Sequence, residues 1–272
     1  GGLKILEEWN QRRRDLRIDR SATELLEEEV EKRPDAIAVV YRDSWVSFGE
    51  LNRKANRLAH HLISKGVKVD EAVGLCASRG IEMVVGMIGI LKTGGCYAPL
   101  DPLYPSQRLL YMLKNAQVRL IVVDEYARGR LPKGEAEEVD LSRWSDLEAH
   151  SDANPSVRVS GGNLGYIIYT SGSTGQPKGI GLPQAALRNL IAWHLDEIPQ
   201  ARKTLQFSSM SFDVSYLELF SSWLSGGSVY VLDEEKRVDA SQLKEYLIEE
   251  GIEIAMLPVV VLQQVAEQMV KE

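Results

Sequence analysis

Hydrophobic positions along the chain fall into short apolar runs separated by segments with a helical period. Helical spacing places Leu25, Leu26 and Val30 on one face of a helix, which Pro34 ends. Ser47 and Glu50 form a capping-box pattern, which predicts that another helix begins there. In the first half, we expect strands at 36–41, 71–76, 96–100 and 118–123, helices at 21–35, from 47 to Gly66 and from Pro105 onward, and a nearly all-apolar segment at 81–91.

The same alternation returns in the second half of the chain, after a polar stretch. Residues 125–160 have mixed charge and little periodicity, so we interpret them as excursions between two sheet-building regions. Alternating strands and helices predict an α/β fold with mainly parallel sheets, covered by helices, whose ligands bind beyond the carboxyl ends of the strands. We expect strands from Tyr166, near 204–207, at 228–232 and at 252–257, and helices at 184–195, 214–225, 240–249 and 259–270.

Composition narrows the function classes. The 272 residues suffice for one large domain or two smaller ones. Lys and Arg total 32 against 39 Asp and Glu, and the net charge of −7 argues against nucleic acid and anionic membranes as partners. Cys76 and Cys96 are too few for a disulfide framework or a zinc site. With no export signal or membrane span in the sequence, we expect a cytoplasmic protein.

The segment from Tyr166 to Gly179 has the composition of a polyphosphate-binding loop. An apolar strand runs directly into glycines, which let the backbone approach an anion, and into hydroxyl residues and a lysine. A flexible linker is the simpler alternative, but linkers do not normally follow four β-prone residues and close with Pro-Lys-Gly. The predicted phosphate-binding residues are Thr170, Ser171, Gly172, Ser173, Thr174, Gly175 and Lys178.

Other glycine-rich motifs do not fit this segment. A Walker loop needs lysine directly after glycine, whereas Gln176 and Pro177 intervene here. The dinucleotide pattern GxGxxG fails after Gly181, and the chain contains no GxSxG nucleophile elbow.

The loop sequence YTSGSTGQPKG resembles the phosphate-loop signature of adenylate-forming enzymes, the superfamily of acyl-CoA ligases, luciferases and peptide-synthetase adenylation domains. Three more segments resemble, in order and spacing, the early core motifs of nonribosomal peptide synthetase adenylation domains. These segments are SFGELN at 47–52, LKTGGCYAPLDPLYP at 91–105 with Arg108, and FDVS at 212–215.

The resemblance implies activation of an amino acid with ATP and Mg²⁺. The amino-acid carboxylate attacks the α-phosphate, giving aminoacyl-AMP and pyrophosphate, and the phosphopantetheine thiol of a carrier domain then takes the acyl group. Positioning and charge neutralisation dominate chemistry of this kind. The implied partners are the amino acid, a peptidyl carrier domain and neighbouring synthetase domains.

Four residues are candidates for the amino-acid pocket. Asp213 precedes a helix, where an N-cap is the alternative explanation, but the resemblance implies a pair with the α-ammonium group of the substrate. The resemblance also assigns Val214, Leu217 and Met256 to the pocket, whereas core packing is their default role. Their apolar character favours a hydrophobic or small aliphatic amino acid.

The resemblance also predicts the domain organisation. Residues 51–185 form a first α/β subdomain that ends in the phosphate loop, whereas 1–50 and 186–272 contribute to a second, incomplete sheet. The family's motifs for adenine and ribose and its mobile lid with the catalytic lysine lie beyond Glu272. We therefore expect the amino-terminal half of an adenylation domain, inactive alone, and assign no catalytic residue or metal ligand. Gln184 stands where the family usually has a histidine.

Two alternatives remain open from the sequence. One is an acyl-CoA ligase acting on an acid without an amine, which Asp213 argues against. The other is a non-catalytic module that serves assembly or ATP binding.

Tyr97, Asp101 and Arg108 are assigned structural roles, because Asp-Pro and Tyr-Pro enforce turns.

Overall fold

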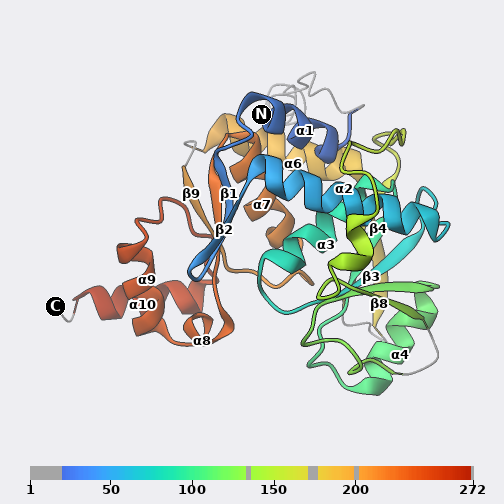
Figure 1. Cartoon of the computed structure of the whole chain (residues 1–272). Helices are drawn as coiled ribbons and strands as arrows, with labels where there is room; N and C mark the ends of the chain where they lie inside the picture. The colour runs from blue at the N-terminus through green and yellow to red at the C-terminus, as the bar shows by residue number, and fades with distance from the viewer. Residues whose placement is uncertain (1–19, 133–135, 171–176, 199–201, 271–272) are drawn as a thin grey trace, which may run out of the picture.

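The computed structural model describes residues 20–132, 136–170, 177–198 and 202–270. Two sheets lie on either side of a central layer of helices, and further helices cover their outer faces (Figure 1). The predicted α/β class with two helix-covered, mainly parallel sheets is confirmed.

The larger sheet has six described strands in the order β6-β5-β3-β4-β7-β8. All neighbours are parallel except β7 and β8, which form an antiparallel pair. Its carboxyl edge therefore collects the ends of five strands. The strands are β3 (Ala72–Cys76), β4 (Cys96–Pro99), β5 (Leu120–Val123), β6 (Glu137–Asp140), β7 (Leu164–Thr170) and β8 (Lys178–Pro183).

The smaller sheet joins segments that are far apart in the sequence. Its order is β2-β1-β10-β9, in which β1 and β2 are antiparallel and the remaining pairs are parallel. The amino-terminal strands are thus completed by strands more than 150 residues later. The strands are β1 (Ile37–Tyr41), β2 (Ser44–Ser47), β9 (Lys203–Gln206) and β10 (Ser228–Val231).

Side chains that alternate along each strand build the layers. Val73 and Leu75 of β3 join the central core with the helices between the sheets, whereas Cys76 joins a core under α4. A third core lies under α9 and α10. The helices are α1 (Ala22–Lys32), α2 (Phe48–Ser64), α3 (Ile81–Lys92), α4 (Ser106–Asn115), α5 (Ser145–Glu148), α6 (Gln184–Glu197), α7 (Val214–Leu224), α8 (Glu234–Arg237), α9 (Ala240–Glu249) and α10 (Val259–Val270).

An aromatic row connects the two sheets through α7. The first two rings belong to β4 and β7 of the larger sheet, and the last indole donates a hydrogen bond of 3.0 Å to the Ala38 carbonyl oxygen of β1. Consecutive ring centroids lie 4.3 to 5.7 Å apart, within the range of favourable aromatic pairs. The row runs in the order Tyr97, Tyr166, Tyr216, Phe220 and Trp223.

Local signals explain where the first helices begin and end. The Ser21 hydroxyl accepts the Glu24 N–H at 3.1 Å, and the Glu24 carboxylate accepts the Ser21 N–H at 2.7 Å, which completes a capping box. Ser47 caps α2 as predicted by accepting the Glu50 N–H at 3.2 Å. Gly66, with φ +83°, follows the end of this helix, where a left-handed residue favours glycine.

Several elements differ from the sequence prediction. The polar stretch contains β6 and α5, and both β2 and β8 were missed. The predicted strand at 252–257 is wrong, because this segment forms a single parallel bridge, between Ile254 and Thr204 of β9. Backbone hydrogen bonds near this bridge hold it beside β9 without continuing the ladder.

Helix α2 holds the segment 150–154 through polar contacts. The Asn56 amide donates to the Asp152 carbonyl oxygen at 2.7 Å, and the His61 Nδ1 lies 3.0 Å from the His150 Nε2. Burial, followed by the neighbouring His150, holds the pKa of His61 below its usual value. One imidazole must donate and the other accept, so protonation of both rings breaks this bond.

Acid should therefore loosen this attachment. A histidine whose folded pKa is lowered binds protons more weakly than in the unfolded chain, so stability is greatest above the ordinary pKa of 6.5 and falls as the pH drops through it. We expect His150→Gln to lose less stability than the wild-type chain between about pH 7.5 and about pH 5.5, measured by urea denaturation midpoints. His60→Gln, on the same helix but outside the pair, should show the same change in stability with pH as the wild-type chain. An unchanged pH dependence in His150→Gln would contradict this assignment.

Candidate functional site

A cavity of about 260 Å³ lies where the carboxyl ends of strands from both sheets meet. Its walls are the loops that follow β3, β4 and β9, together with residues near and within α8. This is the position at which open parallel sheets bind ligands. Most of its lining is apolar, and its polar groups include Arg79, Ser208, Ser209 and Arg237.

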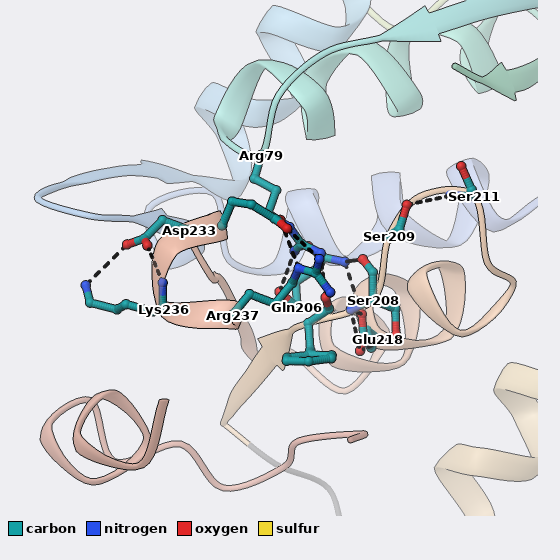
Figure 2. Close-up of polar contacts among 11 residues, drawn as sticks. Arg79, Gln206, Ser208, Ser209, Ser211, Glu218, Asp233, Lys236 and Arg237 are labelled. Atoms are coloured by element: carbon teal, nitrogen blue, oxygen red, sulfur yellow. Dashed lines mark hydrogen bonds and ion pairs between the residues drawn. The ribbon is translucent and has the colours of Figure 1, made fainter. Parts of the chain in front are cut away.

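Arg79 lines this cavity, and its polar contacts are drawn in Figure 2. Its Nε donates to Glu234 at 3.1 Å, and its Nη1 donates to the Gln206 side-chain oxygen at 2.9 Å. The Nη2 donates to the Phe207 carbonyl oxygen. Because Arg79 follows β3 whereas Gln206 ends β9, this one guanidinium joins the two sheets.

Glu218 lies at the far end of the same network, fully buried on α7. Its carboxylate accepts hydrogen bonds from the Ser208 N–H at 3.1 Å and from the Gln206 amide at 3.1 Å. Burial raises the pKa of Glu218 to about 7, although the hydrogen bonds from Ser208 act in the opposite direction. The sequence analysis missed Arg79, Gln206 and Glu218. Of these three residues, only Glu218 could have been noticed in the sequence, because it is the lone acidic residue of an otherwise uncharged, mostly apolar helix.

Asp213 lies exposed immediately before α7. Its Oδ1 accepts the Val214 N–H at 2.9 Å, which is weaker capping than a bond to the second or third helical residue. Burial and then the negative charge of Asp213 raise the pKa of Tyr166, so this carboxylate acts on a phenol of β7. The cavity itself is lined by residues 208–211 of the preceding loop.

Two of the other pocket candidates share one hydrophobic cluster. Leu217 is 9% exposed within the central core, and the partly buried Met256 packs against that core. Val214 begins α7 and is partly exposed. The structure thus gathers Leu217 and Met256 from segments about 40 residues apart, and core packing is their observed environment.

The predicted phosphate loop lies between β7 and β8. Thr170 ends β7, Lys178 begins β8, and these two exposed residues pair directly across the hairpin. The remaining loop candidates, Ser171, Gly172, Ser173, Thr174 and Gly175, lie outside the described residues. Because β7 runs parallel to β4, Thr170 and Lys178 lie at the carboxyl edge of the larger sheet.

Two glycines let β8 pair closely with β7. A Cβ atom at Gly179 would lie 3.1 Å from the Tyr169 ring, and one at Gly181 would lie 3.0 Å from Leu164. Gln184 begins α6 and is 2% exposed. Its side chain is therefore enclosed by protein.

The motif at 91–105, together with Arg108, makes contacts within the protein itself. Tyr97 is buried in the aromatic row, and the Asp101 carboxylate accepts the Leu103 N–H at 2.9 Å within a turn. The Arg108 guanidinium lies 4.0 Å from the Tyr104 ring centroid, a cation–π contact.

Across residues 20–132, 136–170, 177–198 and 202–270, no group of three or more His, Cys, Asp or Glu side chains is placed to hold a metal ion. Within these same ranges, no helix combines the length and apolarity that a membrane crossing needs.

The fold and these placements define an α/β protein whose candidate ligand-binding residues gather at the carboxyl ends of two mainly parallel sheets. The chain belongs to the AMP-binding enzyme family, whose family model matches residues 26–272. The family resemblance inferred from the sequence motifs is thereby confirmed.

The curated relatives of the chain include several synthetases and synthases. The chain is 39% identical to malpinin synthetase of Mortierella alpina over 264 residues, covering 95% of this chain and 3% of that protein. It is 36% identical to bacitracin synthase 1 of Bacillus licheniformis, covering 96% and 5%. With surfactin synthase subunit 2 of Bacillus subtilis, identity is 35%, covering 97% and 7%. The chain spans less than a tenth of each of these relatives.

Solved structures agree with the fold. An AMPPNP-bound form of the nonribosomal peptide synthetase FmoA3 superposes with a TM-score of 0.90 at 24% identity, covering 97% of this chain and 28% of that one. An alpha-methyl-L-serine-AMP-bound form of FmoA3 gives a TM-score of 0.84 at 25% identity, covering 92% and 28%.

Proposed function

We propose that the protein carrying this chain activates an amino acid by adenylation, as part of a nonribosomal peptide synthetase. In this reaction the amino-acid carboxylate oxygen bonds to the α-phosphorus of ATP, and the bond from that phosphorus to the bridging oxygen breaks to release pyrophosphate. A carrier-domain phosphopantetheine thiolate then attacks the acyl carbon, and AMP leaves. The family match and the synthetase relatives support this proposal.

One observation links the two halves of the proposed site. Asp213 is the proposed ammonium partner, and its charge acts on Tyr166. Tyr166 lies four residues before Thr170 on β7, about 13 Å along an extended strand. Tyr166 also packs against α7, with its ring centroid 5.7 Å from that of Tyr216, so the proposed amino-acid end and the proposed phosphate-loop hairpin would lie along one strand. A strand would hold the two proposed ligand groups at a fixed separation, which favours reaction between them.

The exposed pair at the hairpin supports the proposed nucleotide site. Thr170 supplies a hydroxyl donor and Lys178 a positive charge at the two ends of the predicted loop. The other proposed loop residues are Ser171, Gly172, Ser173, Thr174 and Gly175. Mg²⁺ would enter with the phosphates, since this ion is usually bound through them and one or two carboxylates. When bound, it would neutralise charge on the phosphates.

We also propose a substrate class and a domain division. Leu217, Met256 and Val214 are apolar, and the first two belong to the central core or pack against it. These side chains support a hydrophobic or small aliphatic amino acid as the substrate.

All described strands of the larger sheet fall within 72–183, which supports a first subdomain at 51–185. The smaller sheet takes strands from 37–47 and 203–231, which supports assigning 1–50 and 186–272 to a second subdomain.

Amino-acid-dependent ATP–pyrophosphate exchange tests the proposal. The full natural protein should catalyse exchange with one or a few amino acids, and Lys178→Ala should raise the KM for ATP by about tenfold or more, because a charge-assisted phosphate contact is lost. Lys65→Ala removes a lysine that pairs with Glu137 at 2.6 Å, at the amino end of β6 and so on the opposite edge of the larger sheet, and it should leave this KM unchanged. Exchange by the full protein without any amino-acid dependence would contradict the proposal.

A further inference from the structure

The Arg79 guanidinium is held almost completely by acceptors of the protein itself. Its side chain is 10% exposed, although it borders the cavity. Besides the three contacts given above, its Nη1 also donates to the Gln206 carbonyl oxygen at 3.3 Å. Four of the five guanidinium N–H groups are thus engaged by Glu234, Gln206 and Phe207. This arrangement suits holding a backbone segment better than binding a free anion.

The backbone that Arg79 holds is the carboxyl end of β9, where the chain turns toward α7. Gln206 receives Arg79 on its side-chain oxygen, and its amide nitrogen donates to Glu218 and to the Ser208 carbonyl oxygen. The guanidinium therefore fixes which way the Gln206 amide points, since oxygen and nitrogen have opposite hydrogen-bonding roles.

Glu218 transmits this placement to α7. The Ser208 N–H and hydroxyl both donate to its carboxylate, with the hydroxyl at 3.1 Å. Glu218 lies five residues after Asp213, about 7.5 Å along the helix axis. Three donors on one buried carboxylate set the depth and rotation of α7 relative to β9, and thereby the place of Asp213 at its start.

We propose that Arg79 is a positioning residue for amino-acid selection, which acts through Gln206 and Glu218 to hold Asp213 toward the substrate's ammonium group. This inference rests on the proposed function. Burying a guanidinium carries a desolvation cost that apolar side chains would avoid, and its planar fork contributes geometric precision in return. A displacement of about 1 Å in a reacting group costs on the order of a hundredfold in rate, so such precision has a large effect.

The test is a KM comparison in the full natural protein, by ATP–pyrophosphate exchange. Arg79→Lys keeps the charge but loses the fork, and we expect the KM for the amino acid to rise about tenfold or more while that for ATP changes by less than about twofold. Arg119→Lys is the matched control, because Arg119 also donates through its Nε to a glutamate, Glu71 at 2.5 Å, and through its Nη1 to a backbone carbonyl oxygen, that of Lys65 at 2.9 Å, but does not line the cavity. It should leave both KM values unchanged.

Three results would overturn the inference. Equal rises in both KM values, together with a lowered melting temperature, would indicate a general structural role. An unchanged amino-acid KM in Arg79→Lys would remove the inference while the proposed function stands, because the wild-type protein still exchanges. Absence of exchange in the wild-type protein with all amino acids would overturn both.

A second variant serves if Arg79→Lys does not fold. Glu218→Gln keeps the size of the side chain but places an amide donor against the donors from Ser208 and Gln206. We expect the same selective rise in the amino-acid KM. A Glu218→Gln protein with wild-type KM values would overturn the inference. In the double variant, the combined rise should be smaller than the product of the single ones, since both act through Gln206.

Discussion

Asp213→Asn is expected to lower kcat/KM for the amino acid by about a hundredfold or more, which corresponds to about 3 kcal/mol. Asparagine still accepts the Val214 N–H and still caps α7, so the helix is retained. The side chain loses its charge, and the proposed ammonium group loses its counterion. Initial exchange rates at varied amino-acid concentration, with saturating ATP, measure this effect, and the KM for ATP should stay within about twofold.

The chain offers a matched control for the loss of a capping aspartate. Asp239 begins α9 and accepts the N–H groups of Ser241 and Gln242 at 2.9 and 3.1 Å, a stronger cap than Asp213 forms. Asp239→Asn should leave both KM values unchanged. Wild-type activity in Asp213→Asn would contradict an ammonium pair and would favour an acid substrate without an amine.

Local signals in the sequence predicted much of the fold because they act over a few residues. The caps at Ser21 and Ser47 and the stop at Gly66 each depend on hydrogen bonds or backbone angles within one turn. The apolar runs predicted β3, β4 and β5, since strands covered on both faces require continuous apolar side chains.

The missed strand β8 shows the limit of such local reasoning. Its sequence, with Gly179, Gly181 and Pro183, has low strand propensity and resembles a turn. It forms because β7 offers an open edge and because the two glycines leave room for Tyr169 and Leu164. That requirement becomes visible only once the two segments lie side by side.

The candidate site divides in the same way. The phosphate-loop motif is contiguous, so its residues could be named from the sequence, and the structure places Thr170 opposite Lys178. The Arg79 network joins residues 127 positions apart, and no pattern near Arg79 indicates that its acceptors end β9. Pairing of this kind follows from topology, which local periodicity does not determine.

Trp223→Ala is expected to destabilise the fold by about 3–5 kcal/mol, through a large cavity in the central core. Trp223 is fully buried, and its indole N–H is the donor to the Ala38 carbonyl oxygen of β1. Alanine would leave that buried acceptor without this partner and would remove the edge-to-face contact with Phe220, at 5.4 Å between centroids. The urea midpoint of the purified chain, followed by circular dichroism, measures the loss.

Two further tryptophan variants separate the causes. Trp193 on α6 is 51% exposed, so Trp193→Ala should change stability by less than about 0.5 kcal/mol. Trp223→Phe keeps most of the ring but loses the N–H, and the expected cost is about 1–2 kcal/mol. Equal midpoints for Trp223→Ala and Trp193→Ala would contradict a stabilising role for the aromatic row. Because α7 carries both Trp223 and Glu218 and begins after Asp213, the core contact that stabilises the fold also anchors the helix on which the proposed amino-acid site depends.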